Sequence, residues 1–354
     1  MKALLMITGR GMGGDAVTAI NIARALEKKG VDCEYALDHM APGLLLQKAG
    51  IEWHKISIPQ AGGHAATKWK LAKAGFKTTK ASLEAVKLIK KAKPNVVVGI
   101  IGGGAIIGCL SSKMARVPSV GILITPTDAK VCTRLNANIV LPESNLFQQN
   151  LTQENIYKAY SPINPEVIGG DKENAFKKMP ESFDPEKPTL LFSSGSSLFE
   201  ITAQAVQNIF LSDIDANILV VGHPLEDEFL KYLEGDNIIY LGYVDWIQDL
   251  YDLADVSILS DDGVMIHEAI ACKVPIVALT GVKYGRYHNM AAVFPGAVLE
   301  SSINELEEKI KVALDNISKM KAEAQRYGED VLNSGSKVAD IIIKESKKEP
   351  KKKD

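Results

Sequence analysis

The stretch VSILSDDGVMIHEAIACKVPIVAL, residues 256–279, decides the fold because it places a turn and a helix between two buried strands. Val256–Leu259 and Pro275–Leu279 are short apolar runs bounded by turn residues, which is typical of strands in a parallel sheet buried on both faces. Ser260–Gly263 is polar and ends in glycine, and Met265–Cys272 is a helix of small and apolar residues. This unit predicts a doubly wound α/β domain.

Glu268 lies in that helix, near the carboxyl ends of the strands, where such domains bind their ligands. The free N–H groups of a helix N-terminus favour phosphate. A carboxylate repels phosphate but accepts hydrogen bonds from the vicinal hydroxyls of a ribose. The stretch therefore suggests a nucleotide site, with the ribose on Glu268 and with His288 or Asn289 over a sugar. The alternative is that Glu268 is an ordinary acidic residue near a helix N-terminus, where the helix dipole favours it.

The composition is that of a soluble globular protein large enough for two domains. The chain has 354 residues, of which 46% are hydrophobic and 24% charged. A net charge of −2 gives no indication of a nucleic-acid partner. The four cysteines form no CxxC motif, and we find no secretory leader and no apolar run long enough for a membrane span. We expect reduced thiols in a cytoplasmic protein.

The strand–turn–helix pattern also opens the chain. Lys2–Thr8 is an apolar strand, Gly9–Asp15 is a glycine-rich loop, and Ala16–Lys29 has the apolar spacing of a helix. Further along, the strand Asn95–Ile101 runs into a second glycine turn, Gly102–Gly104.

The pattern then restarts after a segment rich in proline and charge at residues 160–188. Thr189–Phe192 is a strand, and a third small-residue turn, Ser193–Ser197, follows it. We expect two Rossmann-like α/β domains facing a cleft. The predicted parts are an N-terminal domain at 1–165, a C-terminal domain at 166–320, a helix at 321–345 that packs back across both domains, and a disordered tail at 346–354.

Four segments, taken in order, resemble the MurG-like group of glycosyltransferase family 28, whose members have the two-domain GT-B fold. Gly9–Asp15 is similar to the family's GGTGGH loop, and Lys93–Ala105 to its KPDVVLGMGGY segment. Ser194–Ser197 stands at its GGSQG loop, and His267–Pro275 fits SEIAAAGLP and keeps the glutamate. The order of the loops and the Glu-to-Pro spacing make the resemblance specific, although each loop alone is a weak signal.

The resemblance implies an inverting transfer of a sugar, GlcNAc from UDP-GlcNAc, to a lipid-diphosphate-linked cell-wall precursor at the cytoplasmic membrane face. We expect no metal and no cofactor, because helix ends would carry the charge of the leaving UDP. We find no spaced aspartate pair (DxD), and Asp261-Asp262 is an adjacent pair typical of a solvated turn. Val244 would read the uracil through its backbone, and Glu268 would bind the ribose. The other implied donor contacts are Gly195, Ser196 and Ser197 at the phosphates, and His288 and Asn289 at the sugar.

The implied contacts have plainer alternatives. The turn at Gly195–Ser197 is also what a tight βα connection looks like, and a single His288 is commonly a surface residue. Four glycines would hold the acceptor's diphosphate or would serve helix–sheet packing: Gly13, Gly14, Gly103 and Gly104.

The chain departs from the family's pattern at three places. Asp15 stands where the family has a histidine, Tyr287-His288 where it has two glutamines, and Gly170–Glu173 where it has Asn-Pro-x-Arg. We predict that Asp15 is the general base that takes the acceptor's hydroxyl proton. The alternative is that Asp15 only caps the first helix.

The segment at residues 64–93 holds nine lysines and one acidic residue, Glu84, with aromatic residues interleaved. Such a segment favours an anionic membrane surface, although a solvated face or a nucleic-acid patch has the same charge. Its place in the acceptor half favours the membrane. The predicted membrane contacts are Lys68, Trp69, Lys70, Lys73, Phe76 and Lys77.

Two rival functions fit the same features. The UDP-GlcNAc 2-epimerases share the two-domain shape and act without a lipid acceptor. The second rival is a non-catalytic subunit that binds a nucleotide sugar, since the family's histidine is absent and the chain could lack a base.

Overall fold

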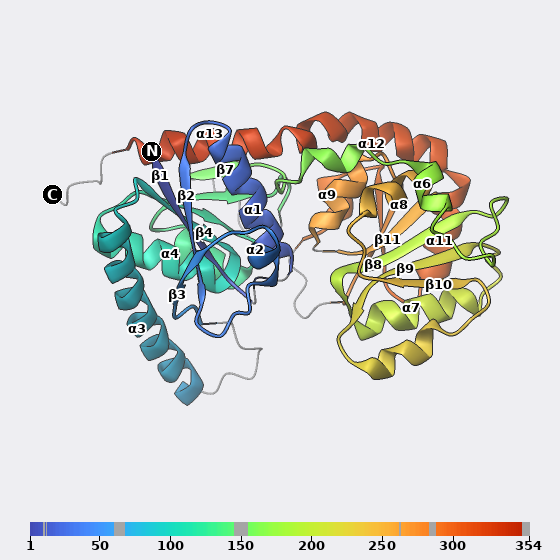
Figure 1. The fold of residues 1–354 in the computed structure, drawn as a ribbon, viewed down its shortest axis with the longest axis horizontal. Coiled ribbons are helices and arrows are strands. Elements are labelled where there is room, and N and C mark those ends of the chain that lie inside the picture. The colour runs from blue at the N-terminus through green and yellow to red at the C-terminus, as the bar shows by residue number, and fades with distance from the viewer. Residues whose placement is uncertain are drawn as a thin grey trace. The chain divides into compact units, whose positions relative to one another are not determined.

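The computed structural model divides the chain into two compact units. One comprises Met1–Pro162 with Asn333–Asp354, and the other comprises Ile163–Leu332. The structure describes residues 1–9, 11, 13–59, 68–144, 155–261, 263–282 and 288–348, with only the backbone at 68–76. Each unit is built on one parallel sheet with helices on both faces (Figure 1). The predicted class, two Rossmann-like α/β domains, is confirmed.

The first unit contains a seven-stranded sheet in the order β3-β2-β1-β4-β5-β6-β7. Alternate residues of β1 face opposite sides, so Leu5 packs under α1 and α13 and Leu4 packs under α3. The strands are β1 Lys2–Ile7, β2 Asp32–Asp38, β3 Trp53–Ile56, β4 Val96–Ile100, β5 Ser119–Ile122, β6 Ala137–Val140 and β7 Ile156–Lys158. The helices are α1 Gly14–Glu27, α2 Leu44–Lys48, α3 Lys68–Ala92, α4 Ile101–Ala115, α5 Pro126–Cys132 and α13 Ser334–Ser346.

The second unit contains a six-stranded sheet in the order β10-β9-β8-β11-β12-β13. Its strands are β8 Thr189–Leu198, β9 Asn217–Pro224, β10 Ile238–Gly242, β11 Val256–Ser260, β12 Ile276–Leu279 and β13 Val298–Ser301. Its helices are η1 Pro165–Ile168, α6 Lys172–Phe176, α7 Glu200–Phe210, η2 Asp227–Leu233, α8 Ile247–Leu253, α9 Val264–Ala271, α10 Met290–Val293, α11 Leu306–Asp315 and α12 Ile317–Leu332. The stretch at 256–279 folds as predicted, as β11, α9 and β12, and β11 lies in the centre of the sheet.

Two of the predicted turns have a different structure. Gly102–Gly104 falls at the start of α4, where Ile101 has a φ of 52° and Gly102 has φ 47° and ψ −122°, so the backbone is kinked before the regular helix begins. The turn at Ser193–Ser197 lies inside β8, which continues to Leu198 with a shift of register against β9. Gly195 makes this irregularity with a φ of 103°, a conformation that favours glycine.

The C-terminal region consists of three helices, α11, α12 and α13, and the last one belongs to the first unit. Val338, Ala339 and Ile342 of α13 lie fully or almost fully buried in the core beneath α1. Within the described ranges, every helix is too short or too polar to cross a bilayer. Residues 349–354 of the expected tail lie outside the described residues.

Candidate functional site

The predicted donor-site residues follow four strands of the second sheet. Because all six strands are parallel, the loops that follow them meet at one edge of that sheet. Gly195–Ser197 lies at the end of β8, Val244 follows β10, Glu268 follows β11, and His288 follows β12. The predicted set therefore shares one edge of one domain. Tyr287 lies outside the described residues.

Glu268 is held by a buried tyrosine. It is the fifth residue of α9, whose first turn contains no acidic residue, so the interpretation of Glu268 as a first-turn dipole residue does not fit. The Tyr251 hydroxyl, on α8, donates to Glu268 Oε2 at 3.2 Å. Burial raises the pKa of the Glu268 carboxyl, and the hydrogen bond from Tyr251 acts in the opposite direction.

The turn at Gly195–Ser197 is ordered by its own serines. The Gly195 N–H donates to Ser193 Oγ at 3.1 Å, and Ser194 Oγ donates to the Ser197 carbonyl at 2.9 Å. This turn also requires glycine at residue 222, because a Cβ on Gly222 would lie 2.8 Å from the Gly195 carbonyl oxygen. If the Gly195 N–H binds phosphate as predicted, it must exchange its hydrogen bond to Ser193 Oγ for one to the phosphate.

His288 is buried, with an exposed fraction of 1%, so the alternative that it is a surface residue is wrong. It lies near the buried His267, whose pKa falls to about 3, chiefly because burial penalises the charged form and also because His288 is close. Asn289 caps α10, since its side-chain oxygen accepts from the Ala292 N–H at 3.0 Å. Both predicted sugar-contact residues therefore have a defined place at the end of the loop after β12.

Val244 follows β10 and is half-buried. The ring of the preceding residue, Tyr243, stacks on His223 with a centroid distance of 6.1 Å and an angle of 17°. His223 lies near the end of β9, so the two neighbouring strands present stacked rings beside Val244.

Asp15 lies in the first turn of α1, one residue past the helix start. Gly13 is the N-cap, and no side chain caps the helix, so the alternative that Asp15 is the cap is wrong. A Cβ at Gly9 would lie 3.3 Å from Asp15 Oδ2, which shows that the carboxyl leans toward the glycine-rich loop. Gly13 and Gly14 are exposed at this helix end.

Gly103 and Gly104 are buried and pack against backbone, Gly103 against the segment after β3 and Gly104 against β1. A Cβ at Gly103 would lie 2.3 Å from the Pro59 carbonyl oxygen, and one at Gly104 would lie 2.5 Å from that of Met6. Close packing of α4 against β1 therefore requires Gly104, and its close packing against the segment after β3 requires Gly103. Their binding of an acceptor diphosphate stays a prediction.

Asp128 is a residue of this region that sequence reasoning missed. Its carboxylate is fully buried and accepts from the N–H groups of Gly102 at 2.7 Å and Thr125 at 3.0 Å. Burial raises its pKa to about 6 despite these hydrogen bonds. The signal in the sequence is Thr125-Pro-Thr-Asp128, which forms a capping box at the start of α5.

In the part of the chain that the structure describes, no group of three or more His, Cys, Asp or Glu side chains is arranged to hold a metal ion. The interpretation of Asp261-Asp262 as a solvated turn is wrong for Asp261, which is buried with an exposed fraction of 2%, and Asp262 lies outside the described residues. A spaced pair that the sequence reasoning overlooked, Asp213 and Asp215, precedes β9 at the opposite edge from Glu268. Asp215 forms an ion pair with Lys187 at 2.6 Å.

The basic segment forms most of α3, a 25-residue helix. Lys77 is exposed, and the side chains of Lys68, Trp69, Lys70, Lys73 and Phe76 lie outside the described residues. The Glu84 carboxylate interacts with residues outside α3, because it contacts His39 Nε2 at 2.7 Å and accepts a hydrogen bond from the Ser57 N–H at 3.0 Å.

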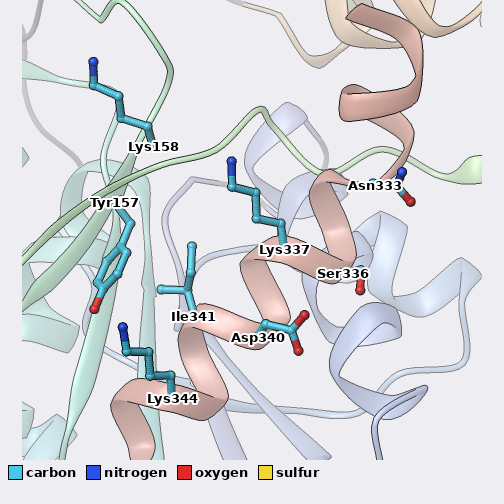
Figure 2. Close-up of a pocket in the computed structure, with 8 residues that line it drawn as sticks. All are labelled: Tyr157, Lys158, Asn333, Ser336, Lys337, Asp340, Ile341 and Lys344. Atoms are coloured by element: carbon cyan, nitrogen blue, oxygen red, sulfur yellow. The ribbon is translucent and has the colours of Figure 1, made fainter.

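A groove of about 510 Å³ lies elsewhere in the first unit, between β7 and α13 (Figure 2). Its lysines, Lys158, Lys337 and Lys344, do not converge on one point, and Lys344 lies over the Tyr157 ring at 5.4 Å. No predicted site residue lines it.

Comparison with known families decides the class of the protein. The model "Glycosyltransferase family 28 N-terminal domain" matches residues 5–121, and "Glycosyl transferases group 1" matches residues 195–316. The chain is a glycosyltransferase related to family 28. The two matches lie one in each unit, and the enzyme therefore has both halves of the GT-B architecture.

Known proteins align with this glycosyltransferase over nearly its full length. The UDP-N-acetylglucosamine–N-acetylmuramyl-(pentapeptide) pyrophosphoryl-undecaprenol N-acetylglucosamine transferase of Haemophilus ducreyi is 23% identical over 98% of this chain and 100% of its own length. Among solved structures, Acinetobacter baumannii MurG has a TM-score of 0.67 at 18% identity, covering 97% of this chain and 99% of that one. Anabaena HepE in complex with UDP has a TM-score of 0.69 at 16% identity, covering 97% and 100%. At these identities the solved structures share the fold.

Proposed function

We propose that the enzyme transfers GlcNAc from UDP-GlcNAc, with inversion, to a lipid-diphosphate-linked cell-wall precursor at the cytoplasmic face of the membrane. The full-length similarity to a transferase of that name supports the substrate class. The observation that carries the proposal is Glu268, a carboxylate partly withdrawn from water at the ligand-binding edge of the second sheet.

Glu268 suits a ribose better than a phosphate. An ionised carboxylate accepts hydrogen bonds from two neighbouring hydroxyls and repels a phosphate. The start of α9 and the turn at Gly195–Ser197 belong to the same edge and would receive the diphosphate, since N–H groups at helix starts favour anions. Val244 and His288 complete the proposed donor site, at the uracil and the sugar.

Asp15 is the proposed base. Its carboxyl lies toward the glycine-rich loop, where the proposal places the acceptor. The hydroxyl oxygen attacks the anomeric carbon, its proton passes to Asp15, and the bond to the UDP oxygen breaks. The negative charge that develops on the leaving UDP is stabilised by N–H donors of the second unit.

The membrane face is proposed from the charge of α3. Nine lysines and one acid fall at residues 64–93, and the acid is engaged by His39 and Ser57. Lysines near an anionic surface each add about 1 kcal/mol of attraction. The proposal predicts binding of the enzyme to vesicles with anionic lipids, weakened by salt.

The first test is calorimetric binding of UDP, UDP-GlcNAc, UDP-glucose and ADP to the wild type, Glu268→Ala and a control, Glu200→Ala. Glu200 is an exposed acid in the first turn of α7, in the same unit. We expect selective binding of UDP nucleotides that is strongly weakened, but still measurable, in Glu268→Ala and kept in Glu200→Ala. If the wild type binds none of the four nucleotides in preference to the others, the proposed donor site is wrong, and the transferase proposal is wrong with it.

The rival functions separate in a turnover assay. Incubation with UDP-GlcNAc and no lipid would release ManNAc from an epimerase, whereas the proposed transferase releases UDP only when a lipid-diphosphate acceptor is present. A binding subunit would bind UDP and never release it from UDP-GlcNAc with any acceptor.

A further inference from the structure

Tyr251 is the buried residue that joins α8 to the proposed ribose site. Its side chain has an exposed fraction of 1% and belongs to the core of the second unit. The hydroxyl lies 3.2 Å from Glu268 Oε2 and 3.4 Å from the Met265 carbonyl oxygen. Both acceptors belong to α9, so this one hydroxyl fixes α8 to the part of α9 that carries Glu268.

The Tyr251 hydroxyl is a permanent donor. Burial raises its pKa well above the ordinary value, and the nearby Glu268 charge and hydrogen bond act in the same direction. A hydroxyl has a single proton, and of its two acceptors the carboxylate forms the stronger bond. Glu268 Oε2 is therefore the oxygen that Tyr251 holds.

We propose that Tyr251 is a positioning residue for nucleotide recognition, whose hydroxyl fixes one oxygen of Glu268 so that the other accepts from the ribose hydroxyls. This inference rests on the proposed function, in which Glu268 binds the ribose. A glutamate side chain has three rotatable bonds, and holding one oxygen in advance removes the entropic cost of ordering it when the nucleotide arrives.

The same hydrogen bond affects the charge of Glu268. Burial favours the neutral carboxylic acid, and the bond from Tyr251 favours the carboxylate. The nucleotide hydroxyls need the carboxylate, so affinity falls as the pH falls through the pKa of Glu268. Removal of the Tyr251 hydroxyl moves that fall to higher pH.

The experiment measures binding of UDP and of 2′,3′-dideoxy-UDP, which lacks both ribose hydroxyls, to the wild type and Tyr251→Phe. The ring remains in this variant, and only the hydroxyl is lost. Since a hydrogen bond to a charged group contributes enough to change an equilibrium about tenfold, we expect UDP to bind about tenfold more weakly and dideoxy-UDP to bind as before. The pH midpoint for UDP binding should rise.

Two further variants separate positioning from a structural role. Tyr327→Phe removes another tyrosine hydrogen bond of the same unit, to the Pro295 carbonyl at 3.1 Å, and should leave both affinities unchanged. In a Glu268→Ala background, Tyr251→Phe should cause no further loss of UDP binding, because the carboxylate it positions is gone.

Three outcomes would overturn the inference. Tyr251→Phe with wild-type UDP affinity and pH profile would show that the hydroxyl is not needed, while the proposed function stands. An equal loss of UDP and dideoxy-UDP would show a general packing role. Wild-type protein that binds no UDP would overturn the proposed function itself.

Discussion

Asp128 should make the first unit more stable in mild acid than at neutral pH. Its pKa is raised from 3.8 to about 6, because burial penalises the carboxylate more than its hydrogen bonds favour it. A carboxyl with a higher pKa in the native state binds its proton more tightly when folded, so protonation stabilises the native state. This stabilisation is fully present below about pH 3.8 and is lost as the pH rises through about 6.

The size of the effect follows from the shift. The limiting difference is about 3 kcal/mol at 1.36 kcal/mol per pKa unit, and about 2 kcal/mol of it falls between about pH 7.5 and pH 4.5. Asp128→Asn carries no titrating group at this site. The difference in unfolding free energy between wild type and variant should therefore shift by about 2 kcal/mol in favour of the wild type on going from pH 7.5 to 4.5.

The assay is urea unfolding followed by tryptophan fluorescence at several pH values. Trp246→Phe is introduced in both proteins, so that only the tryptophans of the first unit, Trp53 and Trp69, report. Groups that titrate in both proteins cancel in the difference. A difference that stays flat from pH 4.5 to 7.5, or that changes in the opposite direction, would refute the assignment of a raised pKa to Asp128.

Further predictions concern the glycines, the base and the metal. Gly104→Ala should destabilise the first unit by about 1–3 kcal/mol in urea unfolding, because its Cβ would lie 2.5 Å from the Met6 carbonyl oxygen. Gly13→Ala should leave the stability unchanged, because no atom lies within 4 Å of its Cβ. Equal stability of the two variants would contradict the packing role of Gly104. Asp15→Asn should bind UDP normally yet turn over about 10²-fold or more slowly, and a wild-type rate would exclude Asp15 as the base. Turnover should survive EDTA, and a loss restored by magnesium would contradict a metal-independent transfer.

The local structure that could be predicted from the sequence is the part carried by short-range patterns. Apolar runs such as Val256–Leu259 and their glycine boundaries predicted the buried strands and the helices between them. The helix predicted at Ala16–Lys29 forms α1, with bounds Gly14–Glu27. Strand β7 was missed because three residues at the edge of a sheet, Ile156–Lys158, carry too little pattern.

The contacts that complete the candidate site could not be predicted, because they depend on packing. Tyr251 and Glu268 are 17 positions apart on different helices, and nothing in either helix alone indicates their hydrogen bond. Asp128 meets Gly102 only because α5 packs against α4. The burial of His288 likewise follows from the elements around it, since a single histidine has no pattern of its own.

The return of α13 to the first unit has a consequence for the order of folding during synthesis. The first unit includes Met1–Pro162, yet part of its core comes from Val338, Ala339 and Ile342, which leave the ribosome after the whole second unit. The second unit is one continuous segment, Ile163–Leu332, and has all its residues earlier. The domain made second can therefore finish folding first, while the nascent first domain keeps an apolar face exposed until α13 has been made.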